Sequence, residues 1–170
     1  MPSDVRAEAF AAFAKDSKAV VHDRGIRRRI APMVDGNHQR IAMALSLTLS
    51  LPGASVLVYG DEIGMGDDLS QPDRVSVRSP MQWTAGKNGG FSKAAPSKLI
   101  QPAIDQGRFA YRHINVAQQE DDPASLLGQV KALIRARRQV SKLLRGRAFP
   151  VSHENPAVHV RAVGDGVNLV

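Results

Sequence analysis

The sequence predicts an α/β fold in which a helix is followed closely by a buried strand. Residues 38–51 are expected to form a helix that is apolar on nearly all sides, and Pro52-Gly53 ends it. Residues 55–60 form a short run rich in β-branched and aromatic side chains, which is typical of a parallel strand buried on both faces. One such strand cannot form a sheet, and the sequence offers almost nothing to pair with it. We therefore expect the chain to be the C-terminal part of a larger α/β protein.

Two further helices are predicted from apolar side chains at helical spacing, over residues 4–14 and 123–143. Asn37 is well placed to cap the helix over 38–51, because its short side chain can accept a backbone N–H of the first turn. Pro123 suits the first turn of the last helix, where its missing N–H has no helical partner.

The remaining segments are predicted as a long loop and a terminal hairpin. Residues 61–123 are polar and rich in glycine and proline, and a stretch of that length without regular structure is often functional. Residues 157–163 alternate between polar and apolar side chains. They are expected to turn at 164–166 and pair with a strand over 167–170.

Composition excludes several kinds of site. The 170 residues include no cysteine, so a disulfide scaffold, a thiol nucleophile and a thiolate metal site are ruled out. The five histidines show no paired metal spacing, and we expect no metal and no cofactor. The longest uncharged stretch, 41–58, is cut by Pro52-Gly53, so a membrane segment is not expected. These features suggest a cytoplasmic protein.

The formal net charge of +7 raises the question of an anionic partner. Basic side chains gather at residues 24–29 and on the last predicted helix, whose inner apolar stripe Arg137 interrupts. The outer stripe of that helix consists of Lys131, Arg135, Arg138, Lys142 and Arg145. Both groups could contact phosphates. No aromatic residues are interleaved with them, so a solvated helix face is the preferred interpretation and nucleic acid is a disfavoured partner.

The first candidate site follows the predicted strand directly. Asp61 and Glu62 lie at its carboxyl end, where parallel sheets place their active sites. Neighbours on an extended strand point to opposite faces, so these two carboxylates cannot act as a catalytic pair unless the backbone turns between them. A purely structural role for one of them, as a cap or a bridge within the loop, is equally open.

The second candidate site surrounds the only tryptophan, Trp83. Asp73, Arg74, Arg78 and Gln82 precede it. Guanidinium groups beside an indole suit a sugar or an anion, because the forks donate to oxygens and the ring stacks on apolar sugar faces. The alternative, which composition alone favours, is that Trp83 simply anchors the loop to the core.

Several motifs in register resemble trehalose synthases, which belong to the α-amylase superfamily (glycoside hydrolase family 13). The motifs are RGIRRRIAPM at 24–33, SLPGASVLVYGDEIGMGD at 50–67, VRSPMQW at 77–83, NGGFS at 88–92, INV at 114–116 and DPASLL at 122–127. Together they span most of residues 10–145. The run that ends in PMQW is shared with α-glucosidases and oligo-1,6-glucosidases, so an α-glucosidase-type fragment is the alternative within this superfamily.

The resemblance implies a place in the family's (β/α)8 TIM barrel. Residues 38–51 would be the seventh barrel helix, 55–60 the eighth strand and 123–143 the eighth helix. Residues 1–147 would then be a partial catalytic barrel, and residues 148–170 the start of the family's C-terminal antiparallel β domain. Asp61, Glu62, Asp73, Arg74, Arg78 and Gln82 would line the substrate pocket.

The resemblance also implies what this stretch of the family lacks. The nucleophile aspartate, the acid/base glutamate and the second aspartate lie on strands four, five and seven of the barrel. The last of these belongs to an Asn-His-Asp motif, and the only Asn-His pair here, Asn37-His38, continues into Gln39. No catalytic residue is therefore assigned. Val75 and Ala117 stand where the family usually has acidic residues, which weakens the case for sugar contact.

Two interpretations follow. In the first, the chain is part of an enzyme that cleaves an α-glucosidic bond of maltose or trehalose through a covalent glucosyl-enzyme and re-adds the glucose. It would be inactive alone and could require a separately encoded N-terminal barrel half. In the second, it is a small basic interaction module, and strongly salt-dependent binding to polyanions would identify it.

Overall fold

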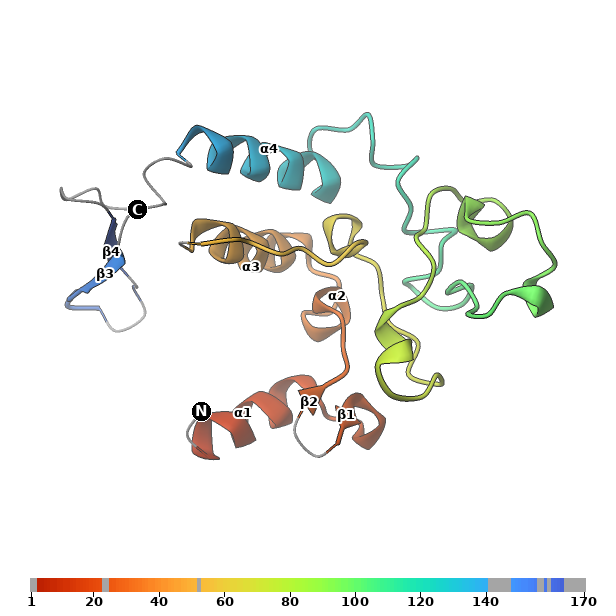
Figure 1. The fold of residues 1–170 in the computed structure, drawn as a ribbon, viewed down its shortest axis with the longest axis horizontal. Coiled ribbons are helices and arrows are strands. Elements are labelled where there is room, and N and C mark those ends of the chain that lie inside the picture. The colour runs from red at the N-terminus through yellow and green to blue at the C-terminus, as the bar shows by residue number, and fades with distance from the viewer. Residues whose placement is uncertain are drawn as a thin grey trace.

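The computed structural model describes residues 3–22, 25–51, 53–140, 148–155, 158 and 160–163 (Figure 1). The helices are α1 (Ser3–Phe13), α2 (Ile30–Met33), α3 (His38–Ser50) and α4 (Leu126–Gln139), and the strands are β1 (Val20–Val21), β2 (Gly25–Ile26), β3 (Ala148–Val151) and β4 (Val160–Val163). The strands form two separate antiparallel pairs, β1 with β2 and β3 with β4. The predicted helix over residues 4–14 is confirmed as α1, although none of its residues is buried.

The predicted helix over 38–51 is confirmed as α3. The Asn37 side chain accepts a hydrogen bond from the backbone N–H of Arg40 at 3.0 Å, which satisfies one of the free donors at the helix start. Ile41, Leu45 and Leu49 are the buried residues of the helix. Their spacing of four places them on one stripe, which faces α4 and the start of the long loop.

The last long helix, α4, begins at Leu126 and not at Pro123. Ser125 is its N-cap, because the Ser125 hydroxyl accepts a hydrogen bond from the backbone N–H of Gly128 at 3.1 Å. The Ser125 hydroxyl also donates to the carbonyl of Gln119 at 2.8 Å, which fixes the entry into the helix. The predicted start was wrong because the serine cap outcompetes the proline as the boundary.

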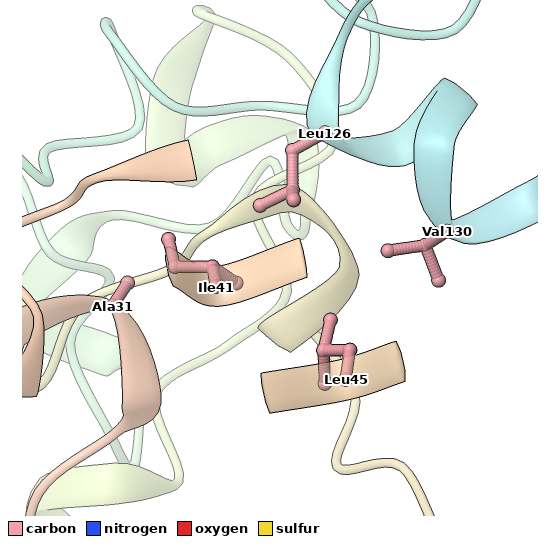
Figure 2. Close-up of a cluster of buried hydrophobic side chains, with 5 residues drawn as sticks. All are labelled: Ala31, Ile41, Leu45, Leu126 and Val130. Carbon is pink, nitrogen blue, oxygen red and sulfur yellow. The ribbon is translucent and has the colours of Figure 1, made fainter. Parts of the chain in front are cut away.

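The main core lies where α3 and α4 run side by side (Figure 1). Figure 2 shows its five buried side chains, which converge from α2, α3 and α4: Ala31, Ile41, Leu45, Leu126 and Val130. A second, smaller cluster of Ile63, Met65 and Met81 holds the long loop together. The two clusters anchor the loop to the helical layer.

Arg137 joins the two long helices by hydrogen bonds. Its guanidinium donates to the carbonyls of Leu49, Leu51 at 2.6 Å and Gly53 at 2.6 Å, just at and beyond the end of α3. These carbonyls are among the groups that have no partner within a helix. The arginine that interrupts the apolar stripe of α4 is therefore the C-terminal cap of its neighbour.

The predicted strand over residues 55–60 is wrong for this structure, because that segment belongs to no sheet. Leu57 packs against the main core. Val56 and Val58 are 79% and 51% exposed, so the buried environment expected for them is not present. The physical reason is the one that the sequence indicated: a strand of this kind needs hydrogen-bonded neighbours, and the described strands pair only with one another.

The long polar segment is confirmed as mainly irregular. It contains four short 3-10 turns, at Asp61–Ile63, Asp73–Val77, Lys87–Gly90 and Pro96–Lys98. In Figure 1 it forms the yellow-green to cyan part of the chain, beyond the start of α4. Among the described helices, none is long and apolar enough to cross a membrane.

The C-terminal hairpin pairs β4 with β3, in the register Ala148 opposite Val163 and Val151 opposite Val160. The sequence analysis missed β3, which contains a proline. The predicted turn at 164–166 and the strand over 167–170 lie outside the described residues.

Candidate functional site

A cavity of about 750 Å³ lies in the long loop, next to the end of the 55–60 segment. Its lining includes three aromatic and three charged side chains: Tyr59, Trp83, Phe91, Glu62, Arg78 and Lys98. Two of the predicted site residues, Glu62 and Arg78, are among the lining residues. The other four, Asp61, Asp73, Arg74 and Gln82, are not.

Glu62 is placed by a tight turn that begins at Gly60. Gly60 has a φ of 89°, in the left-handed region that favours glycine, and a 3-10 turn over Asp61–Ile63 follows. The backbone N–H of Gly60 donates to Glu62 Oε2 at 2.7 Å. The turn therefore brings the Glu62 carboxylate back onto its own backbone at the edge of the cavity.

Asp61 has a different partner from Glu62. Its carboxylate lies 3.1 Å from Nη2 of Arg29 and is largely buried. Burial raises the pKa of Asp61 above its ordinary value of 3.8, the Arg29 charge opposes this rise, and the nearby Glu62 adds to it. The backbone does turn between the two carboxylates, but the turn directs them to separate partners.

Arg29 is the buried centre of this region, and the sequence analysis treated it only as part of a basic run. Its guanidinium donates to the carbonyl of Val77 at 2.8 Å and to the carbonyl of Tyr59, and it stacks over the Tyr59 ring at 5.5 Å. With the Asp61 ion pair, these contacts tie two cavity-lining segments to one side chain.

The neighbouring arginines have similar internal roles. Arg27 donates to the carbonyls of Asp73 at 3.2 Å and Leu69 at 3.3 Å, and Arg28 donates through Nε to Asp67 Oδ2 at 2.9 Å. The basic run is therefore engaged with the loop that follows Gly60. Its partners are about 40 residues distant in the sequence, so no local pattern could have identified them.

Asp73, Arg74 and Gln82 lie outside the cavity lining. Asp73 has a φ of 43°, and its carbonyl accepts the Ser76 hydroxyl at 3.0 Å, while Arg74 is exposed. Gln82 is fully buried, and its side-chain amide donates to the carbonyls of Ile114 and, at 3.3 Å, Phe109. In this structure the Gln82 amide serves the backbone and not the cavity.

The backbone of Trp83 is anchored in the loop, and its side chain is half-exposed at the cavity. Its backbone is anchored, because its N–H donates to the Gly89 carbonyl at 2.7 Å and its carbonyl accepts the N–H of Ala117 at 3.0 Å. Its side chain is 48% exposed, and Tyr59 and Phe91 are about as exposed. Three half-exposed aromatic rings in one cavity form a surface on which apolar sugar faces can stack.

The chemistry of the lining suits a neutral ligand with many hydroxyl groups. Glu62 can accept hydrogen bonds, and Arg78 and Lys98 can donate them. The cavity therefore offers a charged acceptor and charged donors beside its aromatic rings. Within the described residues, no group of three or more His, Asp or Glu side chains could hold a metal ion.

Comparisons with known proteins identify the family to which the chain belongs. Residues 17–146 match the α-amylase catalytic-domain family. The chain is 44% identical over 157 residues to the trehalose synthase of Pimelobacter sp. (strain R48), a match that covers 91% of this chain and 27% of that relative. The chain thus spans about a quarter of the length of this curated relative.

Solved structures show the same relationship at the level of the fold. An isomaltulose synthase mutant from Erwinia rhapontici NX5, in complex with D-glucose, superposes with a TM-score of 0.60 at 22% identity, over 82% of this chain and 31% of that one. The α-amylase from H. orenii superposes with a TM-score of 0.58 at 26% identity, over 80% of this chain and 25% of that one.

Proposed function

Because the chain belongs to the α-amylase catalytic-domain family, we propose that it supplies one wall of an α-glucoside pocket in a trehalose synthase-like (β/α)8 barrel. The observation that carries this proposal is the cavity beside the 55–60 segment, with Glu62, Arg78 and three half-exposed aromatic rings in its lining. Trehalose and maltose are the expected ligands. An α-glucosidase-type specificity is the second candidate, because the PMQW run at 80–83 is common to both groups.

The proposed place in the barrel rests on the alternation along residues 55–60. Leu57 packs on the layer formed by α3 and α4, whereas Val56 and Val58 are exposed. This alternation is that of a barrel strand with helices on its outer face. We assign α3 as the seventh barrel helix and α4 as the eighth helix, and residues 55–60 as the segment that would pair as the eighth strand only in the complete barrel.

The same proposal divides the chain into two parts. Residues 1–147 would be a partial catalytic barrel and 148–170 the start of the antiparallel β domain, which is supported by the position of β3. Asp61 would shape the pocket wall through Arg29, and Asp73 and Arg74 would lie on the substrate side of the loop in the complete barrel. The cytoplasmic location stays a prediction from the sequence.

The 170-residue chain is proposed to bind sugar without turning it over. Asp61 and Glu62 are held by Arg29 and by the Gly60 N–H, and neither is placed as a nucleophile with a partner acid. Purified chain should release no glucose from maltose, trehalose or p-nitrophenyl α-glucoside. Glucose release that follows the purified chain through a second column would refute this part of the proposal.

Binding can be measured through Trp83, the only tryptophan in the sequence and a lining residue of the cavity. Maltose and trehalose should change its fluorescence saturably, whereas the β-linked cellobiose should not. Glu62→Gln and Arg78→Gln should each weaken binding about tenfold, because each removes a charged hydrogen-bonding group. Arg112→Gln is the matched control, since Arg112 is exposed and donates to the Asp105 carbonyl outside the cavity.

The partner in this proposal is the rest of the barrel, which a separately encoded N-terminal half could supply. Co-expression with the part of the Pimelobacter trehalose synthase that this chain does not match should restore maltose–trehalose interconversion. A Glu62→Gln chain should restore less activity. If the two wild-type parts are purified together and remain inactive, this partner is wrong.

The alternative of a basic interaction module depends on the basic stripe of the last helix, where Lys131, Arg135 and Arg138 are exposed. The contacts of Arg27, Arg28 and Arg29 within the chain argue only against the basic run at 24–29 as a phosphate-binding surface. No aromatic residues are interleaved with the stripe, so we prefer a solvated helix face. The chain should therefore not be retained on heparin at physiological ionic strength. Retention that falls steeply with added salt would favour the interaction module instead.

A further inference from the structure

We propose that Arg29 is a positioning residue of the cavity, whose buried guanidinium sets Glu62 and Arg78 relative to each other and so sets the affinity for an α-glucoside. The statement about affinity rests on the proposed function. The statement about position does not, because it concerns only contacts within the chain.

The geometry places Arg29 between the segments that carry Glu62 and Arg78, two of the three charged lining residues. On one side, Nη1 donates to the carbonyl of Val77, the residue before Arg78, at 2.8 Å. On the other side, Nη2 lies 3.1 Å from the carboxylate of Asp61, the residue before Glu62. One planar group therefore holds the residues that immediately precede both lining side chains.

Tyr59 strengthens the same connection. Its carbonyl accepts a hydrogen bond from Arg29, its ring lies under the guanidinium, and its hydroxyl donates to the carbonyl of Ser79 at 2.9 Å. The two cavity-lining segments are thus joined both through Arg29 and directly. Because Tyr59 is itself a lining residue, a shift of Arg29 would move the cavity surface.

The turn at Gly60 leaves room for two neighbouring side chains, those of Met65 and Arg29. A Cβ atom at Gly60 would clash first with Met65 Sδ and would lie 2.9 Å from Nη2 of Arg29, closer than real Cβ contacts. Arg29 itself is only 4% exposed. A buried guanidinium is retained when its fork satisfies several acceptors at once, and a lysine ammonium in the same place could not span them.

The side-chain contacts described for Arg29 all go to segments that flank the cavity, and none goes to the α3–α4 core. Arg28 provides the matched comparison. Its Nε pairs with Asp67 at 2.9 Å, and its side chain is 21% exposed. Asp67 Oδ2 also accepts the backbone N–H of Arg29 at 2.9 Å. Arg28→Lys keeps a cation beside Asp67 and changes no contact of the Arg29 side chain.

The first arm of the test uses NMR of the sugar-free protein to follow the position of the Glu62 carboxylate and of the cavity. The Gly60 N–H donates to the Glu62 carboxylate, so its amide cross-peak reports that contact, and the single Trp83 indole cross-peak reports the cavity. In Arg29→Lys, the Gly60 cross-peak should move toward its position in Glu62→Gln, and the Trp83 cross-peak should shift. The α4 cross-peaks should stay in place, and Arg28→Lys should resemble the wild type.

The second arm measures maltose and trehalose affinity. Arg29→Lys should weaken binding about tenfold, as expected for a displaced charged contact. If Arg29 acts through Glu62, its replacement should have a much smaller effect in a Glu62→Gln background. Equal effects in both backgrounds, with the Gly60 cross-peak unmoved, would overturn the proposal.

The two arms distinguish a failure of the proposed sugar-binding function from a failure of the positioning role of Arg29. If the wild-type chain binds no sugar, the proposed function fails, and the Gly60 and Trp83 cross-peaks still decide the role of Arg29. If Arg29→Lys does not fold, Asp61→Asn takes its place, because it weakens only the ion pair. A smaller Gly60 shift in the same direction would then support the positioning role, and an unmoved cross-peak would refute it.

Discussion

Replacement of Arg137 by methionine tests how the two long helices of this chain are joined. The Arg137 guanidinium donates to three carbonyls at the end of α3, those of Leu49, Leu51 and Gly53. Methionine keeps most of the apolar stem that packs between the helices but removes every donor. Arg137→Met should therefore destabilise the protein through the lost capping contacts alone.

The magnitude follows from the number and exposure of these contacts. A hydrogen bond to a charged group contributes about 1.5–3 kcal/mol when it is shielded from water. Leu51 and Gly53 are exposed, so water can replace the arginine at their carbonyls, and only the Leu49 carbonyl is shielded. We expect a loss of about 1–2 kcal/mol, which lowers Tm by about 2–8 °C for a chain of this length.

Thermal unfolding followed by circular dichroism at 222 nm measures this loss. Arg138→Met is the matched control, because Arg138 is adjacent, exposed and on the outer face of α4. The control should unfold within about 0.5 kcal/mol of the wild type, as surface substitutions usually do. If the two variants unfold at the same temperature, Arg137 does not cap α3 in solution.

Three further substitutions have expected outcomes in the same assay. Gly60→Ala should lower the free energy of unfolding by about 1–2 kcal/mol, because alanine is strained in the left-handed backbone conformation of Gly60, and by a further amount because its Cβ would clash with neighbouring atoms. Gly107→Ala is the control: Gly107 has a φ of 71° but open space around it, so only the backbone strain applies. Leu126→Ala should cost about 2–5 kcal/mol, because Leu126 is fully buried in the main core. Burial raises the pKa of Asp61 although the Arg29 charge opposes the rise, so the folded state favours the protonated carboxyl. Wild-type stability should therefore fall as the pH rises from 3.8 through the raised pKa, whereas Asp61→Asn has no carboxyl to ionise and should gain in Tm relative to the wild type over the same pH range. An equal gain in the exposed variant Asp121→Asn would contradict this assignment to Asp61.

Local signals in the sequence were sufficient for α1 and α3, whereas the short helix α2 was not predicted. Apolar spacing predicted α3, and Asn37 predicted its start, because both the stripe and the cap depend on residues within a few positions of each other. The start of α4 was misplaced by three residues, because Pro123 and Ser125 both give helix-start signals and the hydroxyl cap decided between them.

The predicted strand failed for a reason that lies outside its own residues. The 55–60 segment has the side chains of a buried strand, and Leu57 does pack against the main core. A strand, however, exists only through hydrogen bonds to its neighbours, and propensity cannot supply them. The side chains of residues 55–60 therefore predict a strand that the described part of the chain cannot pair.

The candidate site could be predicted in part. Glu62 and Arg78 follow recognisable motifs and do line the cavity. Arg29 could not be found in this way, because its partners Asp61 and Val77 are 32 and 48 residues away, and nothing local distinguishes it from Arg28. A buried arginine is visible only once the loop that covers it has been placed.

The arginine contacts also change what the positive charge of the chain means. Arg27, Arg29 and Arg137 donate mainly to backbone carbonyls, in segments where regular structure does not satisfy those carbonyls. A long loop next to a helical layer leaves many such acceptors, and the arginine fork can satisfy two or three of them at once. Part of the basic character of the sequence is therefore explained by the need to hold irregular backbone in place around a cavity. These guanidinium groups keep their charge, but their N–H donors are already used within the chain and are less available for direct contacts with an anionic partner.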